Sequence, residues 1–171
     1  LSLERPRDYA LIDVIGTVNV LEASRLSDTK PKIVFASSNK VYGKQQPPWR
    51  EDISMVPEGP YGQSKMSAEE FCKQYYKYYG INTVSIRYHH VIGTRSNSEL
   101  ALAIFVERIL QNKSPEIHGR FENGNFVSCS ADYTHINDAI RGTLLGLAKN
   151  NGFDIFNIAN EKLTTVLELA E

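Results

Sequence analysis

Apolar residues recur at helical spacing in some segments of the chain and form short β-branched runs in others. Residues 9–26 carry apolar side chains close to a period of 3.6, which predicts a helix. Pro31 then interrupts the helical pattern, because proline lacks the backbone donor. Residues 33–38 read IVFASS, an apolar run that ends in small polar residues and is typical of a buried parallel strand. The opening third of the chain therefore predicts a helix followed by a strand.

The same two patterns alternate through the rest of the chain. A second helix is predicted over residues 61–79, closed by Gly80, since glycine is the usual residue at a left-handed C-terminal cap. The other predicted elements are, in chain order, a loop at 41–60, a strand at 81–88, a loop at 89–99, a helix at 101–110, an irregular or short-stranded segment at 114–132, a helix at 135–150, a strand at 153–160 and a helix from 164 to 171. Strands that alternate with helices of this length indicate an α/β protein with a parallel sheet.

Length and charge narrow the class of protein. The 171 residues suffice for one domain, or part of one, with a sizeable core. The net charge of −1 and the lack of a basic block argue against nucleic acid as a partner. No apolar run is as long as a membrane span, and the first ten residues lack the layout of a signal peptide. We therefore expect a cytoplasmic protein with neither a nucleic-acid nor a membrane partner.

The two cysteines, Cys72 and Cys129, stand alone in the sequence. Neither belongs to a CxxC motif or has a histidine at ligand spacing, so we expect no disulfide and no metal site.

Polar side chains follow the predicted strands at the edge where ligands of parallel sheets bind. Ser37 and Ser38 close the first strand, and Tyr88, His89 and His90 follow the second. These residues are the first candidates for a binding site.

Tyr61 and Lys65 begin the helix that lies between these two strands in the chain. A tyrosine hydroxyl ordinarily has a pKa of about 10, and a cation one helical turn away favours its phenolate form, which can act as a base. A tyrosine and a lysine four apart also occur on solvated helices without any function. Of the nine tyrosines, however, only Tyr61 has a lysine four residues on, and a serine at a strand end could orient the same substrate hydroxyl. Ser38 is the candidate for that serine.

Five motifs occur once each along the chain, and their order and spacing are distinctive: GTVNVLEAS, IVFASSNKVYG, PYGQSKMSAEE, VSIRYHHVIG, and ADYTHINDAIRG followed by FNIAN. Together they resemble the extended short-chain dehydrogenase/reductase family, and within it the NAD-dependent nucleotide-sugar epimerase and dehydratase branch, which includes UDP-glucose/galactose 4-epimerases. The resemblance implies a Rossmann-like parallel sheet with flanking helices. Residues 1–171 would form the central and C-terminal part of an NAD(P)-binding domain, with segments of a small substrate lobe at about 94–131.

The resemblance also implies a role for each candidate residue. Tyr61 would be the catalytic base, Lys65 would favour its phenolate and hydrogen-bond the nicotinamide ribose, and Ser38 would orient the sugar hydroxyl. The cofactor would be NAD, with NADP as the alternative. The implied cofactor-binding residues are Tyr61, Lys65, Tyr88 and Asp13, and the implied substrate-binding residues are Ser38, Asn39 and His90.

Two positions after Ser38 discriminate between reactions. Dehydratases of this branch carry an Asp-Glu pair there, whereas this chain has Asn39 and Lys40, so dehydration is not expected. Epimerisation of a nucleotide sugar through a transient ketone is the favoured reaction. A reductase of sugars or other ketones, and a non-catalytic dinucleotide-binding relative, remain as alternatives.

Several positions depart from the family pattern. Asp13 replaces a helix asparagine, and His90 stands where an asparagine is common. Ala131 replaces an arginine that grips the substrate phosphates, and Arg95 or Arg120 could substitute for it.

The GxxGxxG phosphate loop of the family does not occur among the eleven glycines. We therefore expect the sequence to be a piece of a longer protein, with a truncated relative as the alternative. Relatives dimerise through a four-helix bundle, which implies a homodimer formed by helices 9–26 and 61–79.

Overall fold

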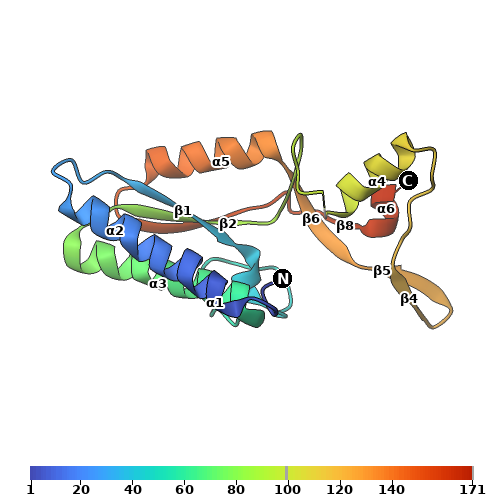
Figure 1. Ribbon diagram of the computed structural model, residues 1–171, viewed down its shortest axis with the longest axis horizontal. Coiled ribbons are helices and arrows are strands. Elements are labelled where there is room, and N and C mark those ends of the chain that lie inside the picture. Colours follow the sequence, from blue (N-terminus) through green and yellow to red (C-terminus); the bar gives the residue numbers. More distant parts are fainter. Residues whose placement is uncertain (99, 171) are drawn as a thin grey trace. The chain divides into compact units, whose positions relative to one another are not determined.

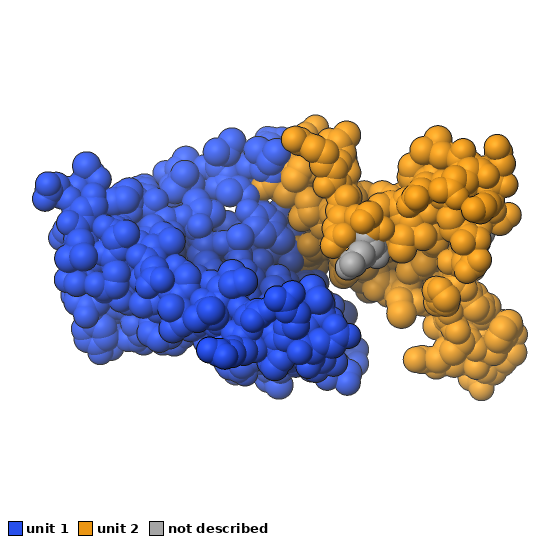
Figure 2. Space-filling model, viewed as in Figure 1, with its two compact units in different colours: residues 1–88, 140–158 blue, residues 89–139, 159–171 orange. Residues whose placement is uncertain are grey.

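The computed structural model describes residues 1–98 and 100–170 and divides the chain into two compact units (Figure 2). Unit 1 contains residues 1–88 and 140–158, and unit 2 contains residues 89–139 and 159–171. Each unit is described by itself below.

A three-stranded parallel sheet forms the centre of unit 1, in the order β1 (Ile33–Ser38), β2 (Thr83–Tyr88), β7 (Phe153–Ile158). The strands are in register, so that Ser38 pairs with Tyr88 and Tyr88 with Ile158. Their carboxyl ends therefore lie level at one edge. This arrangement confirms the predicted parallel sheet.

Helices cover both faces of this sheet (Figure 1). The helices α2 (Gly16–Leu26) and α3 (Gly59–Tyr79) lie on one face, and α5 (Ile136–Lys149) lies on the other. Alternation along β2 explains the two layers, since successive side chains of a strand point to opposite faces. Arg87 bonds to Glu69 of α3, whereas Ile86 contacts α5 where Gly146 has no side chain.

The core of unit 1 lies between the sheet and α2 and α3. Its buried members come from four elements or their ends, and they are Leu21, Phe35, Ala68, Cys72 and Ile81. Cys72 is thus a core residue, and burial raises the pKa of its thiol to about 12. Cys129, by contrast, is exposed.

The helix predicted at 9–26 is present but is not uniform. It consists of α1 (Pro6–Tyr9), the π-helical turn η1 (Ala10–Ile15) and α2. The helix predicted from residue 61 begins two residues earlier and ends as predicted, with Gly80 at φ 68° and ψ 24°. Part of the loop predicted at 41–60 is helical, because the 3₁₀ turn η2 (Asn39–Tyr42) follows β1 directly.

Unit 2 combines short strands with two helices. Its elements are β3 (His90–Ile92), α4 (Ala101–Leu110), β4 (Gly119–Glu122), β5 (Asn125–Ser128), β6 (Ser130–His135), β8 (Leu163–Thr165) and α6 (Val166–Ala170). β6 pairs in parallel with β3 and antiparallel with β8, while β4 and β5 form a hairpin.

Two sequence predictions for unit 2 are wrong. The segment 89–99 was predicted as loop but contains β3, and β8 occupies the start of the helix predicted from 164. Both strands have only three residues, and each is defined by its partner β6 rather than by a local pattern. Positions 99 and 171 of these two predictions lie outside the described residues.

Among the described residues, none of the helices combines the length and the apolar character that a membrane span requires. Over the same residues, no three His, Cys, Asp or Glu side chains gather in a group that could hold a metal ion.

Candidate active site

Ser38 ends β1 and caps the turn that follows it. Its Oγ accepts a hydrogen bond from the Lys40 backbone N–H at 3.2 Å and donates to Asn39 Oδ1 at 3.4 Å. Ser38 and Asn39 are both buried. These two neighbouring residues, both predicted to bind substrate, thus lie at the carboxyl edge of the sheet.

Two glycines hold the turn after Ser38 against the start of α3. A Cβ on Gly62 would lie 2.6 Å from the carbonyl oxygen of Lys40, and a Cβ on Gly43 would lie 2.0 Å from that of Val56. Gly43 also has φ 63°, which favours glycine. The VYG and PYG motifs thus permit a close backbone approach, which places the first turn of α3 beside the turn that Ser38 caps.

Tyr61 and Lys65 lie one turn apart at the N-terminal end of α3. The Lys65 Nζ is 5.7 Å from the centre of the Tyr61 ring and 5.3 Å from that of the Phe35 ring. The rings of Tyr9 and Tyr61 pack edge to face, with 5.6 Å between ring centres. The predicted tyrosine and lysine therefore do meet, with the cation close to the aromatic ring.

Asp13 contacts this pair from η1. Its Oδ1 forms an ion pair with Lys65 Nζ at 3.1 Å. The Ser64 hydroxyl donates to its Oδ2 at 2.8 Å, with the Tyr61 carbonyl oxygen as a second acceptor at 2.9 Å. The sequence did not point to Ser64 or Tyr9, although Ser64 directly precedes Lys65.

Tyr88 and His90 have other neighbours than Tyr61 and Lys65. The Tyr88 hydroxyl forms a hydrogen bond of 2.6 Å with Thr143 Oγ1, so it points to α5. His90 belongs to unit 2, where its ring lies 5.8 Å from that of Tyr133. Next to it, burial lowers the pKa of His89, and the charge of Asp132 only partly opposes this effect.

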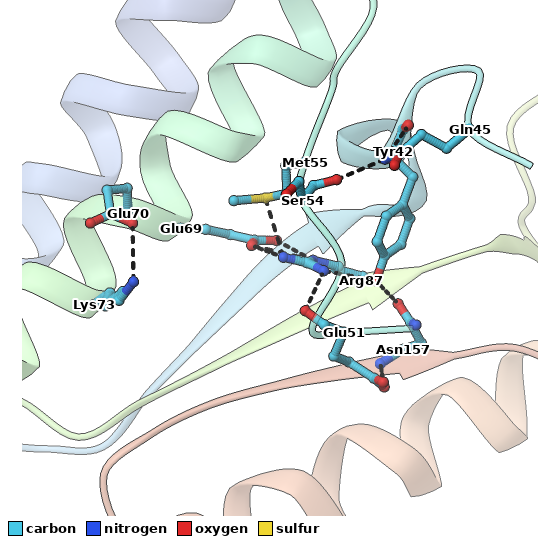
Figure 3. A network of polar contacts seen from close by, with 10 residues as sticks. All are labelled: Tyr42, Gln45, Glu51, Ser54, Met55, Glu69, Glu70, Lys73, Arg87 and Asn157. Carbon is cyan, nitrogen blue, oxygen red and sulfur yellow. Dashed lines mark hydrogen bonds and ion pairs between the residues drawn. The ribbon is translucent and has the colours of Figure 1, made fainter. Parts of the chain in front are cut away.

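A buried polar network supports the loop that joins Ser38 to α3 (Figure 3). Arg87 and Glu69 are each 1% exposed, and the guanidinium binds the carboxylate through Nε at 3.0 Å and Nη2 at 2.7 Å. Arg87 Nη1 also donates to the Tyr42 hydroxyl at 2.7 Å, which in turn donates to Asn157 Oδ1 at 2.9 Å. Asn157 Nδ2 then donates to the Trp49 carbonyl at 2.8 Å. The network thus ties the loop to the sheet and to α3.

Arg87 reaches two more positions of the same loop, the Glu51 carbonyl at 3.4 Å and Met55 Sδ at 3.2 Å. Burial alone would lower the pKa of the Arg87 guanidinium, but its hydrogen bonds and charge interactions with Glu69 and Tyr42 together outweigh burial, so the pKa is raised. Removing one partner of such a buried pair typically costs about 3 to 5 kcal/mol. The loop is therefore held by groups that a single substitution would leave uncompensated.

The two arginines named as phosphate-binding candidates differ in their surroundings. Arg120 forms an exposed ion pair with Glu122 at 2.5 Å. Arg95 lines a cavity of about 400 Å³ in unit 2, together with Ser96, Glu107 and apolar residues of α4. Arg95 is thus placed where a ligand of unit 2 could meet it, while Arg120 is engaged with Glu122.

Known proteins match the amino-acid sequence of this chain over nearly its whole length. A putative UDP-glucose 4-epimerase from Methanocaldococcus jannaschii is 38% identical over 98% of this chain and 54% of its own length. A UDP-glucuronate 4-epimerase from Thermodesulfobacterium geofontis is 31% identical over 99% of this chain and 52% of its own. The chain thus spans about half the length of the curated relatives it matches.

Solved structures give the same result. The Thermus thermophilus UDP-glucose 4-epimerase, solved in complex with NAD, superposes with a TM-score of 0.86 at 30% identity, covering 99% of this chain and 55% of that one. This likeness confirms the predicted Rossmann-like fold. The sequence profile of the NAD dependent epimerase/dehydratase family matches residues 1–159. The chain therefore belongs to the NAD dependent epimerase/dehydratase family.

Proposed function

We propose that the protein epimerises a nucleotide sugar with NAD as cofactor, through a transient ketone of the sugar. One observation carries the proposal. Tyr61 and Lys65 meet on the first turns of α3, and Gly62 packs that helix against the turn capped by Ser38. Family membership and the names of the relatives support the same reaction class.

The donors of this chain fit the nicotinamide end of a dinucleotide. Lys65 directs one N–H to Asp13 and has two more with which to hold ribose hydroxyls. When bound, NAD supplies the group that accepts a hydride from the sugar carbon and returns it.

The proton steps belong to side chains of the chain itself. Tyr61 takes the proton from the sugar hydroxyl as hydride leaves the carbon that bears this hydroxyl. The ammonium of Lys65 favours the phenolate form of Tyr61 that this step requires. The Ser38 hydroxyl holds the sugar oxygen in place for the transfer. Reversal of these steps on the opposite face of the ketone gives the epimer. Asn39 and Lys40 supply no acid–base pair for loss of water, so the reaction stops at epimerisation.

The substrate-binding part of the proposal concerns Asn39, His90 and residues 94–131. Segments within 94–131 form the substrate lobe, His90 contacts the nucleotide-sugar diphosphate, and Asn39 contacts the sugar. Tyr88 and Asp13 lie on the cofactor side. Exposed apolar side chains on η1 and α2, among them Ile12 and Val20, support a homodimer through the helical segments 9–26 and 61–79.

Replacing Tyr61 with Phe tests the proposal directly. Purified protein is incubated with NAD and either UDP-glucose or UDP-glucuronate, and the 4-epimer is quantified by chromatography. Because the variant lacks the proton acceptor, we expect kcat to fall by about 100-fold or more. The exposed Tyr78→Phe is the control and should keep full activity. Full activity of Tyr61→Phe, or failure to convert any nucleotide sugar by wild-type protein with bound NAD, would reject the assignment.

A further inference from the structure

The carboxylate of Asp13 uses both oxygens on the proposed catalytic helix. Oδ1 faces the Lys65 ammonium at 3.1 Å, and Oδ2 accepts from the Ser64 hydroxyl at 2.8 Å. Ser64 and Lys65 are neighbours in α3, but Asp13 lies 51 positions before Ser64 in the chain. The contact is therefore a tertiary contact, and it joins two helical segments at the site.

The backbone at Asp13 is itself unusual. Asp13 lies in the π-helical turn η1 (Ala10–Ile15), and its carbonyl oxygen accepts a hydrogen bond of 2.5 Å from Thr17 Oγ1. Isolated π-turns within α-helices are rare and frequently occur at functional sites. Main-chain and side-chain contacts together thus determine where the carboxylate lies.

The ion pair is protected from water. The side chains of Lys65 and Asp13 are only 15% and 14% exposed, so salt and solvent screen their attraction less than on the surface. The rings of Phe35 and Tyr61 lie beside the ammonium, 5.3 and 5.7 Å from it. An ammonium in such surroundings is costly without a partner, and Asp13 provides one.

Other charged and titratable groups near Asp13 do not compete for Lys65. Arg5 and Asp8 line the same cavity of about 270 Å³ as Asp13, but they pair with each other at 2.5 Å. Tyr9 lines this cavity too, with its ring against Tyr61. Within the described residues, Asp13 is the only carboxylate in an ion pair with Lys65.

From this geometry we infer that Asp13 is a positioning residue for Lys65. It holds the ammonium beside Tyr61 and offsets part of the charge that favours the phenolate. Asp13 thereby acts on Tyr61 through the position and charge of Lys65, an inference that rests on the proposed function.

A first experiment examines Lys65 without cofactor or turnover. The protein is treated with formaldehyde and a borohydride, and methylation of each lysine is followed by mass spectrometry. Asp13→Ala should raise the methylation rate of Lys65 by about tenfold, and Asp13→Asn, which keeps an acceptor oxygen, by less. Lys73, an exposed lysine of α3 that lies 3.8 Å from Glu70, is the internal control and should not change. Equal Lys65 rates in wild type and both variants would overturn the inference.

A second experiment measures the pH dependence of kcat/KM for epimerisation. Asp13→Asn leaves the positive charge of Lys65 uncompensated, so the acid limb of the profile should move to lower pH, by about one unit. Asp13→Ala should lose more activity than Asp13→Asn at every pH. A purely structural role predicts loss in proportion to stability with an unmoved profile, and that result would contradict the inference. Failure of the Tyr61→Phe test would reject the proposed function, whereas the methylation rates judge Asp13 independently.

Discussion

Gly62 and Gly16 are both helical glycines, yet their surroundings predict opposite effects for the same substitution. At Gly62 a Cβ would lie 2.6 Å from the backbone oxygen of Lys40, whereas at Gly16 the nearest atom would be 4.0 Å away. Gly62→Ala should therefore lower the free energy of unfolding by about 1 to 3 kcal/mol, since backbone atoms cannot move aside cheaply. Urea denaturation followed by circular dichroism measures this effect.

Gly16→Ala is the matched control for Gly62→Ala. Alanine restricts the unfolded chain and is the better helix former, so this variant should gain about 0.5 to 1 kcal/mol. A gain of similar size at Gly62 would show that α3 does not pack closely against the turn after Ser38.

The sequence predicted some residues of the candidate site, but it did not predict how they pair. Tyr61, Lys65 and Ser38 stand in motifs with local spacing, and the structure places the first two together on α3. The partner of Lys65 was not predicted, because the pairing of Asp13 with Lys65 depends on how η1 packs against α3. From the sequence, Asp13 was an implied cofactor-binding residue and a departure from the family pattern, but not the partner of Lys65.

The helices α2 and α3 are joined by a polar contact whose stability should depend on pH. The Tyr75 hydroxyl donates to Glu22 Oε1 at 2.5 Å, and Arg25 also binds this carboxylate. Hydrogen bonds from Arg25 and Tyr75 lower the pKa of Glu22 to about 2, and the bond to Glu22 raises the pKa of Tyr75 to about 12. The contact therefore keeps its charged acceptor and neutral donor over a wide pH range.

Tyr75→Phe removes the donor, and its effect on stability should therefore shrink both at low pH and at high pH. Glu22 contributes stability above pH 4.5, which is lost as the pH falls towards 2, because its native pKa is depressed. Tyr75 contributes stability below pH 10, which is lost as the pH rises towards 12, because its native pKa is raised. The advantage of wild type over Tyr75→Phe should thus be largest between pH 4.5 and 10. Thermal melts across pH, with Tyr78→Phe for comparison, measure it, and a difference that stays constant with pH would contradict this account.

Whole elements were predicted well where a local pattern defines them. Strand β1 has the predicted bounds, and Gly80 ends α3 with the predicted left-handed cap. Strands β3 and β8 were missed because three residues carry too little pattern, and each is a strand only through pairing with β6. The π-turn η1 was missed as well, because residues 10–15 keep the apolar spacing of an ordinary helix.

At the scale of the whole molecule, the sequence predicted the fold class and a small substrate lobe, but not that the C-terminal residues from Ala159 group with residues 89–139. The parallel sheet of unit 1 follows from apolar runs that alternate with helices, and the comparisons confirm the Rossmann-like fold. The assignment of residues 94–131 to a substrate lobe stays a prediction. These residues belong to unit 2, which also contains residues 159–171, and local patterns carry no signal for such long-range grouping.

The proposed homodimer gives a prediction for the whole molecule. Val20 lies on α2 with 56% of its surface exposed, and Leu110 lies on α4 with 78% exposed, so both are accessible apolar residues on helices. If helices 9–26 and 61–79 form the interface, Val20→Asp would bury an unpaired charge there and should convert the dimer to a monomer. Leu110→Asp should leave the dimer intact. Sedimentation velocity over a range of protein concentrations decides between the outcomes. A wild type that stays monomeric would reject the homodimer. A dimer that Leu110→Asp disrupts and Val20→Asp does not would place the interface elsewhere on the protein.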